Sequence, residues 1–116
     1  LIHNRKIHLD ASSRVLRGQD TLVKTPGYYQ KKPKVFFIRF HLHPDVEANL
    51  TSNKKKVILK LKDGYGWEFI CSEPRVEIGE GIYLGLGSEV SQNAHIILKG
   101  KVIPERKIKW LFRLIN

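Results

Sequence analysis

Residues 36–44, Phe-Phe-Ile-Arg-Phe-His-Leu-His-Pro, constrain the fold of this chain most, because apolar side chains recur at every second position. This alternation is typical of a β-strand, in which successive side chains point to opposite faces. One predicted face carries Phe36, Ile38, Phe40 and Leu42. The other carries Phe37, Arg39, His41 and His43. We therefore predict a strand that packs one face into a core and presents polar groups on the other.

Arg39, His41 and His43 are the candidate functional residues, as contacts either to substrate or to another domain. A guanidinium and two imidazoles can bind carboxylate, sulfate or a metal ion. Two histidines supply only two ligands, whereas a zinc site needs three or four, so we predict no metal site. Because the stretch is so apolar, we favour a framework role, with bonds to backbone carbonyls or to acids such as Glu77 and Asp20. A substrate role instead predicts that these side chains are open to solvent, with Arg39 available for a bidentate contact.

Strands are expected along the rest of the chain, at intervals of roughly 8 to 12 residues. The turn residues Asp10-Ala11-Ser12-Ser13 and Asp63-Gly64 each predict a hairpin, and Asp-Gly supplies the positive φ angles of a tight turn. Residues 25–33 are expected to form a loop, and the glycine-rich residues 79–81 and 85–88 to form turns or bulges. Outside 36–44, the expected strands are 2–9, 15–23, 46–50, 57–62, 65–71, 76–78, 82–84, 94–98 and 108–115.

No segment shows a sustained 3.6-residue apolar period, so helix should be scarce. Residues 1–116 are therefore predicted to form a single all-β domain, an antiparallel β-sandwich of about nine short strands. The chain starts at Leu1 and contains no methionine, so we interpret it as a piece of a longer protein.

The composition is strongly basic, with 21 Lys and Arg against 11 Asp and Glu and a formal net charge of +10. Such a charge attracts polyanions, but we favour the simpler interpretation that it belongs to a solvated, lysine-rich surface. A nucleic-acid module would interleave basic residues with exposed aromatics. Trp67, Phe69, Trp110 and Phe112 instead share faces with apolar neighbours and are predicted to be core. We expect neither a nucleic-acid partner nor a membrane partner, since no run of about 18 apolar residues is present.

Several motifs of this chain resemble those in the C-terminal part of the heparinase II/III-like polysaccharide lyases. The principal ones are Arg39-Phe40-His41-Leu42-His43-Pro44 with Val46, and Asp63-Gly64-Tyr65-Gly66-Trp67-Glu68-Phe69. Others follow the same order: His3 with Arg5, Arg17-Gly18-Gln19-Asp20-Thr21-Leu22, Ile82-Tyr83, Ile96-Ile97-Leu98-Lys99-Gly100 and Lys109-Trp110. The chain departs from the pattern at two places. Gly79-Glu80-Gly81 stands where a more acidic or serine-containing approach to the tyrosine is expected, and His95 stands where such sequences often carry glutamine.

The resemblance implies a parent protein that cleaves a uronic-acid polysaccharide by β-elimination. In such enzymes the proton-transferring tyrosine and histidine, the carboxylate-neutralising residue and the metal-binding residues lie mostly in the helical toroid and early sandwich. No catalytic residue can therefore be assigned to this chain, and we expect it to be inactive alone and without a cofactor, although the parent could hold a divalent metal.

The partners that the resemblance implies are the N-terminal helical domain missing from this chain and an acidic polysaccharide. The resemblance also implies a bacterial source, with a periplasmic or cytoplasmic location left open. The alternative function is a non-catalytic polyanion- or glycan-binding β-module.

Overall fold

The computed structural model describes residues 2–23, 35–74, 76–84, 90–101 and 105–115. For residues 81–84 and 90–93 it describes the backbone only. These residues form nine strands and no helix, so the predicted all-β sandwich is confirmed. No helix able to cross a membrane exists within these ranges. The strands are β1 (Ile2–Asp10), β2 (Val15–Val23), β3 (Val35–His41), β4 (Glu47–Leu50), β5 (Lys56–Lys60), β6 (Gly66–Cys71), β7 (Val76–Leu84), β8 (Val90–Lys101) and β9 (Glu105–Leu114).

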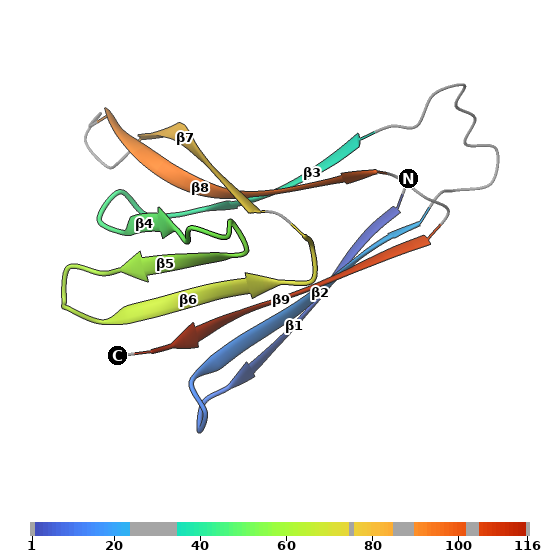
Figure 1. Ribbon diagram of the computed structural model, residues 1–116, viewed down its shortest axis with the longest axis horizontal. Helices are drawn as coiled ribbons and strands as arrows, with labels where there is room; N and C mark the ends of the chain where they lie inside the picture. Colours follow the sequence, from blue (N-terminus) through green and yellow to red (C-terminus); the bar gives the residue numbers. More distant parts are fainter. Residues whose placement is uncertain (1, 24–34, 75, 85–89, 102–104, 116) are drawn as a thin grey trace.

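The strands form two antiparallel sheets that face each other, with the smaller one along the upper side of Figure 1. The larger sheet has six strands in the order β1-β2-β9-β6-β5-β4, and the smaller has three in the order β3-β8-β7. The C-terminal strand β9 lies between β2 and β6 and so joins the N-terminal hairpin to the β4-β5-β6 meander.

The core lies between the sheets and is built from the alternate apolar residues that the sequence predicts. Phe36 and Ile38 of β3 are buried, as are Phe69 of β6 and Trp110 of β9. Phe40 joins the layers, because its ring centroid lies 5.3 Å from that of Phe69 and 4.9 Å from that of Trp110. The prediction that these tryptophan and phenylalanine side chains are core rather than exposed platforms is confirmed for Phe69 and Trp110, while Trp67 and Phe112 are partly buried against the same cluster.

Both predicted hairpins are present, with turn geometry fixed by local side chains. Oδ1 of Asp10 accepts hydrogen bonds from Ser12 and from the backbone nitrogen of Ser13, and these bonds lower the pKa of Asp10 to about 2. In the second hairpin the Gly64 nitrogen donates to the Leu61 carbonyl at 3.0 Å, and Gly64 alone takes a positive φ, of 93°. Of the two residues expected to take positive φ angles, only Gly64 does so, after a turn over Lys62 and Asp63.

Substitution of Gly64 should destabilise the fold through its left-handed backbone conformation alone. A Cβ atom at this position would meet no neighbouring atom, so packing does not contribute. Gly64→Ala should lower the free energy of unfolding by roughly 1–2 kcal/mol, because an alanine Cβ is strained at this φ. Chemical denaturation measures the loss. Gly64→Asn is the control and should retain most of the stability, because asparagine tolerates this conformation; equal losses for the two variants would contradict the explanation.

One region was predicted wrongly. Residues 79–81 do not form a turn, because Val76–Leu84 is one continuous strand paired with β8. The physical reason lies at Gly79, where a Cβ atom would stand 2.6 Å from Nε2 of His95, so the glycine provides space for the imidazole rather than a bend. The predicted loop at 25–33 and turn at 85–88 lie outside the described residues.

Candidate functional site

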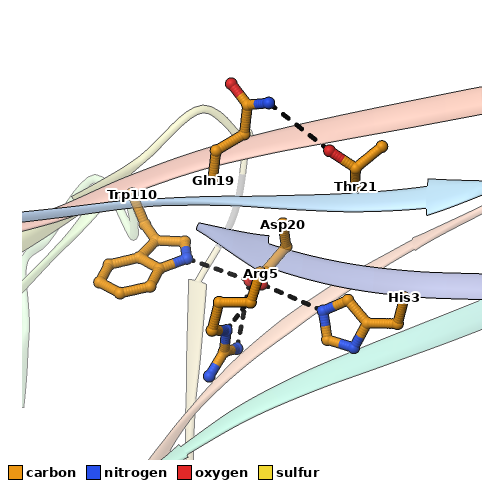
Figure 2. A network of polar contacts seen from close by, with 6 residues as sticks. All are labelled: His3, Arg5, Gln19, Asp20, Thr21 and Trp110. Carbon is orange, nitrogen blue, oxygen red and sulfur yellow. Dashed lines mark hydrogen bonds and ion pairs between the residues drawn. The ribbon is translucent and has the colours of Figure 1, made fainter. Parts of the chain in front are cut away.

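A fully buried carboxylate, Asp20 on β2, is bonded by polar groups from the two neighbouring strands, β1 and β9 (Figure 2). Arg5 on β1 donates from Nε to Oδ1 at 2.7 Å and from Nη2 to Oδ2 at 3.2 Å. His3 Nε2 lies 3.0 Å from Oδ1, and the indole Nε1 of Trp110 donates to Oδ2 at 3.0 Å. We call His3, Arg5, Asp20 and Trp110 the Asp20 centre.

The electrostatics of the Asp20 centre hold the carboxylate in its charged form. Burial by itself raises the pKa of Asp20, but the hydrogen bonds from Arg5, His3 and Trp110 and the charge of Arg5 outweigh it, so this pKa lies below its ordinary value. The Arg5 guanidinium also lies over the rings of Phe40, at 5.0 Å, and Trp110, at 5.6 Å.

The Asp20 centre is therefore a structural ion pair rather than an acid-base group. Four hydrogen bonds occupy the roughly four lone-pair sites of the carboxylate, which leaves no acceptor for a substrate proton. Gly18 makes the arrangement fit, because it pairs with Trp110 across the β2-β9 ladder and a Cβ there would fall 2.0 Å from the indole Cζ2.

The three predicted site residues lie along β3 and just beyond it, away from the Asp20 centre. Arg39, His41 and His43 are all exposed. The expected pairing of Arg39 with Asp20 is wrong, since that carboxylate is occupied by the residues of the Asp20 centre. His43 accepts a hydrogen bond at Nδ1 from the Asp45 nitrogen, at 3.1 Å, and so belongs to the turn after β3. Whether the three contact a substrate or another domain stays a prediction.

Arg39 lies instead in a cluster with an exposed aromatic ring. Phe37 is 50% exposed on the outer side of the three-stranded sheet. The Arg39 guanidinium lies 5.2 Å and the Lys99 ammonium 5.8 Å from its ring centroid, one from the same strand and one from the opposing residue of β8. We call Phe37, Arg39 and Lys99 the aromatic-basic face. Within the described residues, Arg39 and Lys99 form no ion pair.

His41 pairs with a second imidazole at one end of this face. Its ring centroid lies 5.2 Å from that of His95, which is directly opposite on β8. His95 is 9% exposed and its Nδ1 has no hydrogen-bond partner in the described part of the chain. Burial lowers the pKa of His95, and the neighbouring His41 and Arg39 lower it further, so this pair disfavours additional positive charge. The described residues contain no group of three or more His, Cys, Asp and Glu side chains placed to hold a metal.

Sequence reasoning missed both Lys99 and the Asp20 centre. Alternation placed Phe37 beside Arg39, but the position of Lys99 depends on the β3-β8 register, which the sequence does not reveal. For the Asp20 centre, the available signal was the His3-x-Arg5 spacing, which places both side chains on one face of a strand.

The geometry defines a β-sandwich module with a buried ionic centre and an exposed aromatic-basic face. The family model described as "Heparinase II/III-like, C-terminal" matches residues 1–111. The chain belongs to this family.

A curated relative, FtsZ-localized protein C of Caulobacter vibrioides (strain NA1000 / CB15N), is 33% identical over 123 aligned positions. The alignment covers 95% of this chain, and the chain spans about a fifth of the length of that relative, 20%. No solved structure matches the chain.

Proposed function

We propose that this chain is a non-catalytic β-sandwich domain of a larger heparinase II/III-like protein and binds an acidic, uronate-containing polysaccharide through its aromatic-basic face. The observation that carries this proposal is the half-exposed Phe37 ring with two cations within 6 Å of its centroid, neither of which pairs with an acid in the described ranges. An aromatic ring offers an apolar platform to a sugar ring, while guanidinium and ammonium groups bind its carboxylate or sulfate.

The parent protein is proposed to cleave that polysaccharide by β-elimination. A positive group neutralises the uronate carboxylate and so acidifies the C5 proton, which a tyrosine or histidine base removes. The electron pair of the C5–H bond forms the C4=C5 double bond, and the 4-linked oxygen leaves and takes up a proton. The described part of this chain contributes binding surface to such a reaction rather than the base.

Another part of the longer protein is proposed to pack against β1. This edge strand exposes Ile7 and Leu9 at 60% and 67%, although both are on the side of the sheet that faces the core. Exposed apolar residues on a strand edge are typical of contact surfaces. The covering part is expected to be the helical N-terminal domain that the family resemblance implies.

Loss of the two cations of the aromatic-basic face should weaken glycan binding without unfolding the domain. We expect Arg39→Gln/Lys99→Gln to reduce affinity for heparin and alginate about tenfold or more, because each charged hydrogen bond contributes about 1.5–3 kcal/mol. Retention on immobilised glycan and calorimetric titration measure the change. Phe37→Ala should also weaken binding at unchanged charge.

The matched control is Lys55→Gln/Lys60→Gln, which removes the same charge from exposed lysines elsewhere. It should change affinity by less than about twofold at moderate salt, since screening leaves mainly short-range contacts. Equal losses of affinity for the two double variants would show that binding depends only on net charge. That result would contradict specific binding at the aromatic-basic face.

The purified chain should release no unsaturated product from heparan sulfate or alginate, because no catalytic motif is assigned to it. The absorbance of the unsaturated uronate product measures the reaction. Steady growth of that absorbance with the chain alone, and not with a heat-denatured sample, would show that the chain is itself catalytic.

The name of the relative supports a second candidate function, in which this domain helps to position its parent protein at FtsZ. The 33% identity over nearly the whole chain favours it. Co-sedimentation with FtsZ filaments, compared between the wild-type chain and Arg39→Gln/Lys99→Gln, distinguishes this function from glycan binding.

A further inference from the structure

A groove of about 560 Å³ lies on the outer side of the six-stranded sheet, on the opposite side of that sheet from the core. It crosses the strands β1, β2, β9 and β6. The ladder register places Lys6, Gln19 and Lys109 in one cross-strand row and His8, Arg17, Leu111 and Ile70 in the next. Figure 2 shows Gln19 pointing away from Asp20, toward this outer side. We call this feature the outer groove.

Unpaired positive charge is concentrated at the outer groove. Lys6, Arg17 and Lys109 are exposed and line it, and none forms an ion pair with any side chain that the structure describes. On the same sheet, by contrast, Arg113 and Lys56 both pair with Glu68. The groove therefore favours a ligand that brings its own negative charge.

The remaining lining suits a ligand that carries hydroxyl groups between its charges. Gln19 and Ser72 offer neutral hydrogen-bonding groups, and Ile70 and Leu111 offer apolar surface. Lys6 and Lys109 lie two strands apart in one row, which corresponds to about 10 Å between their backbones. The backbone groups of β2 and β9 are consumed by their ladders, so recognition must come from side chains. An acidic sugar chain meets these conditions, whereas an acidic peptide would bring backbone donors and acceptors with no ladder to join.

The outer groove is held rigid from beneath by the Asp20 centre. Gly18 and Trp110 contribute to the groove and are also the pair whose close contact aligns β2 with β9. Arg5, bonded to Asp20, is the neighbour of Lys6 in the sequence. Rigid positioning of the strands lowers the ordering cost of binding.

We propose that the outer groove is a second binding site for an acidic sugar, with Lys6, Arg17 and Lys109 contacting carboxylate or sulfate groups. The choice of ligand rests on the proposed function, whereas the site is defined by its own charge and shape. Since the aromatic-basic face lies on the outer side of the other sheet, the two sites lie on opposite faces of the sandwich. One domain thereby binds two separate polysaccharide chains.

The test is an NMR titration with an alginate-derived uronate hexasaccharide, carried out in the Arg39→Gln/Lys99→Gln background so that only the outer groove remains. We expect saturable shifts at the backbone amides of Gln19, Lys109 and Leu111. Adding Arg17→Gln should weaken this binding about tenfold. Adding Lys60→Gln, an exposed lysine on β5, should change it by less than about twofold.

Two results would overturn the site: groove amides that do not shift at saturating sugar, or equal effects of Arg17→Gln and Lys60→Gln. Tighter binding of a glutamate hexapeptide at the same amides would overturn the choice of ligand. In the wild-type chain, shifts at the groove but not at Phe37 and Lys99 would support the groove while rejecting the aromatic-basic face. Shifts at Phe37 and Lys99 alone would reject the groove and leave the proposed function intact.

Discussion

Asp20→Asn is expected to lower the free energy of unfolding by about 2–4 kcal/mol. Removing one partner of a buried ion pair typically costs 3–5 kcal/mol, and we reduce that figure because the Arg5 side chain is 35% exposed and gains hydration when it loses its partner. The asparagine NH2 group is itself a donor, and it would face the donors of Arg5, His3 and Trp110. Thermal denaturation followed by circular dichroism measures the loss, which should amount to roughly 10 °C or more.

Glu105→Gln is the matched control for Asp20→Asn, because it removes an exposed carboxylate whose nearest cation, Lys107, lies 3.9 Å away. Surface pairs of this kind contribute about 0–1 kcal/mol, so the melting temperature should barely change. If Asp20→Asn changed the melting temperature as little as the control does, the Asp20 centre would not be what stabilises the packing of β1, β2 and β9.

The effect of Asp20→Asn should depend on pH in a defined direction. The pKa of Asp20 is lowered in the folded protein, so its contribution is complete above the unfolded-state pKa of about 4 and is lost as pH falls through the folded-state pKa. The difference in melting temperature between wild type and variant should be constant from about pH 5 to 8 and shrink below about pH 4. A difference that stays constant into strong acid would contradict a charged Asp20.

Gly18→Ala is expected to lower the free energy of unfolding by about 3 kcal/mol. The added Cβ would stand 2.0 Å from Cζ2 and 2.3 Å from Cε2 of Trp110, well inside contact distance. The indole has little room to yield, because its ring packs 4.9 Å from that of Phe40 and its nitrogen is bonded to Asp20. Overpacking of this kind typically costs 1–3 kcal/mol, occasionally more, and we place this case at the upper end.

A double-mutant cycle with Trp110→Phe isolates the steric cause of the Gly18→Ala loss. The smaller ring gives up the bond to Asp20 but opens space beside residue 18, so the double variant should be less destabilised than the sum of the single variants. Urea denaturation of the four proteins provides the free energies. Strict additivity would mean that the alanine methyl group and the indole do not compete for the same space.

The sandwich class was predictable because its signals are local. Alternating apolar residues around Phe36 and turn residues such as Asp63-Gly64 are contained in short windows of sequence. The strand order was not predictable, since β9 pairs with β2 across about ninety residues of intervening chain, as the bond between Trp110 and Asp20 illustrates. The role of Gly79 was not predictable either. A glycine is needed there because of a side chain on the neighbouring strand, not because of the residues next to it in the sequence.

The candidate site was predictable only in part. Alternation placed Arg39 and His41 on the outer face of their strand, where the structure finds them exposed. It did not bring Lys99 to Phe37, nor Lys6 to Arg17 and Lys109, because those groupings depend on strand register. Each of these lysines was visible in the sequence only as one of many surface charges.

The affinity of Arg39→Gln/Lys99→Gln for a uronate oligosaccharide, measured by calorimetric titration well below the melting transition, tests the proposed function most directly. We predict binding about tenfold or more weaker than wild type, with an unchanged melting temperature, since both side chains are exposed and unpaired within the described structure. Wild-type affinity together with wild-type stoichiometry in this variant, or a lowered melting temperature that accounts for the loss, would contradict a glycan-binding role for the aromatic-basic face.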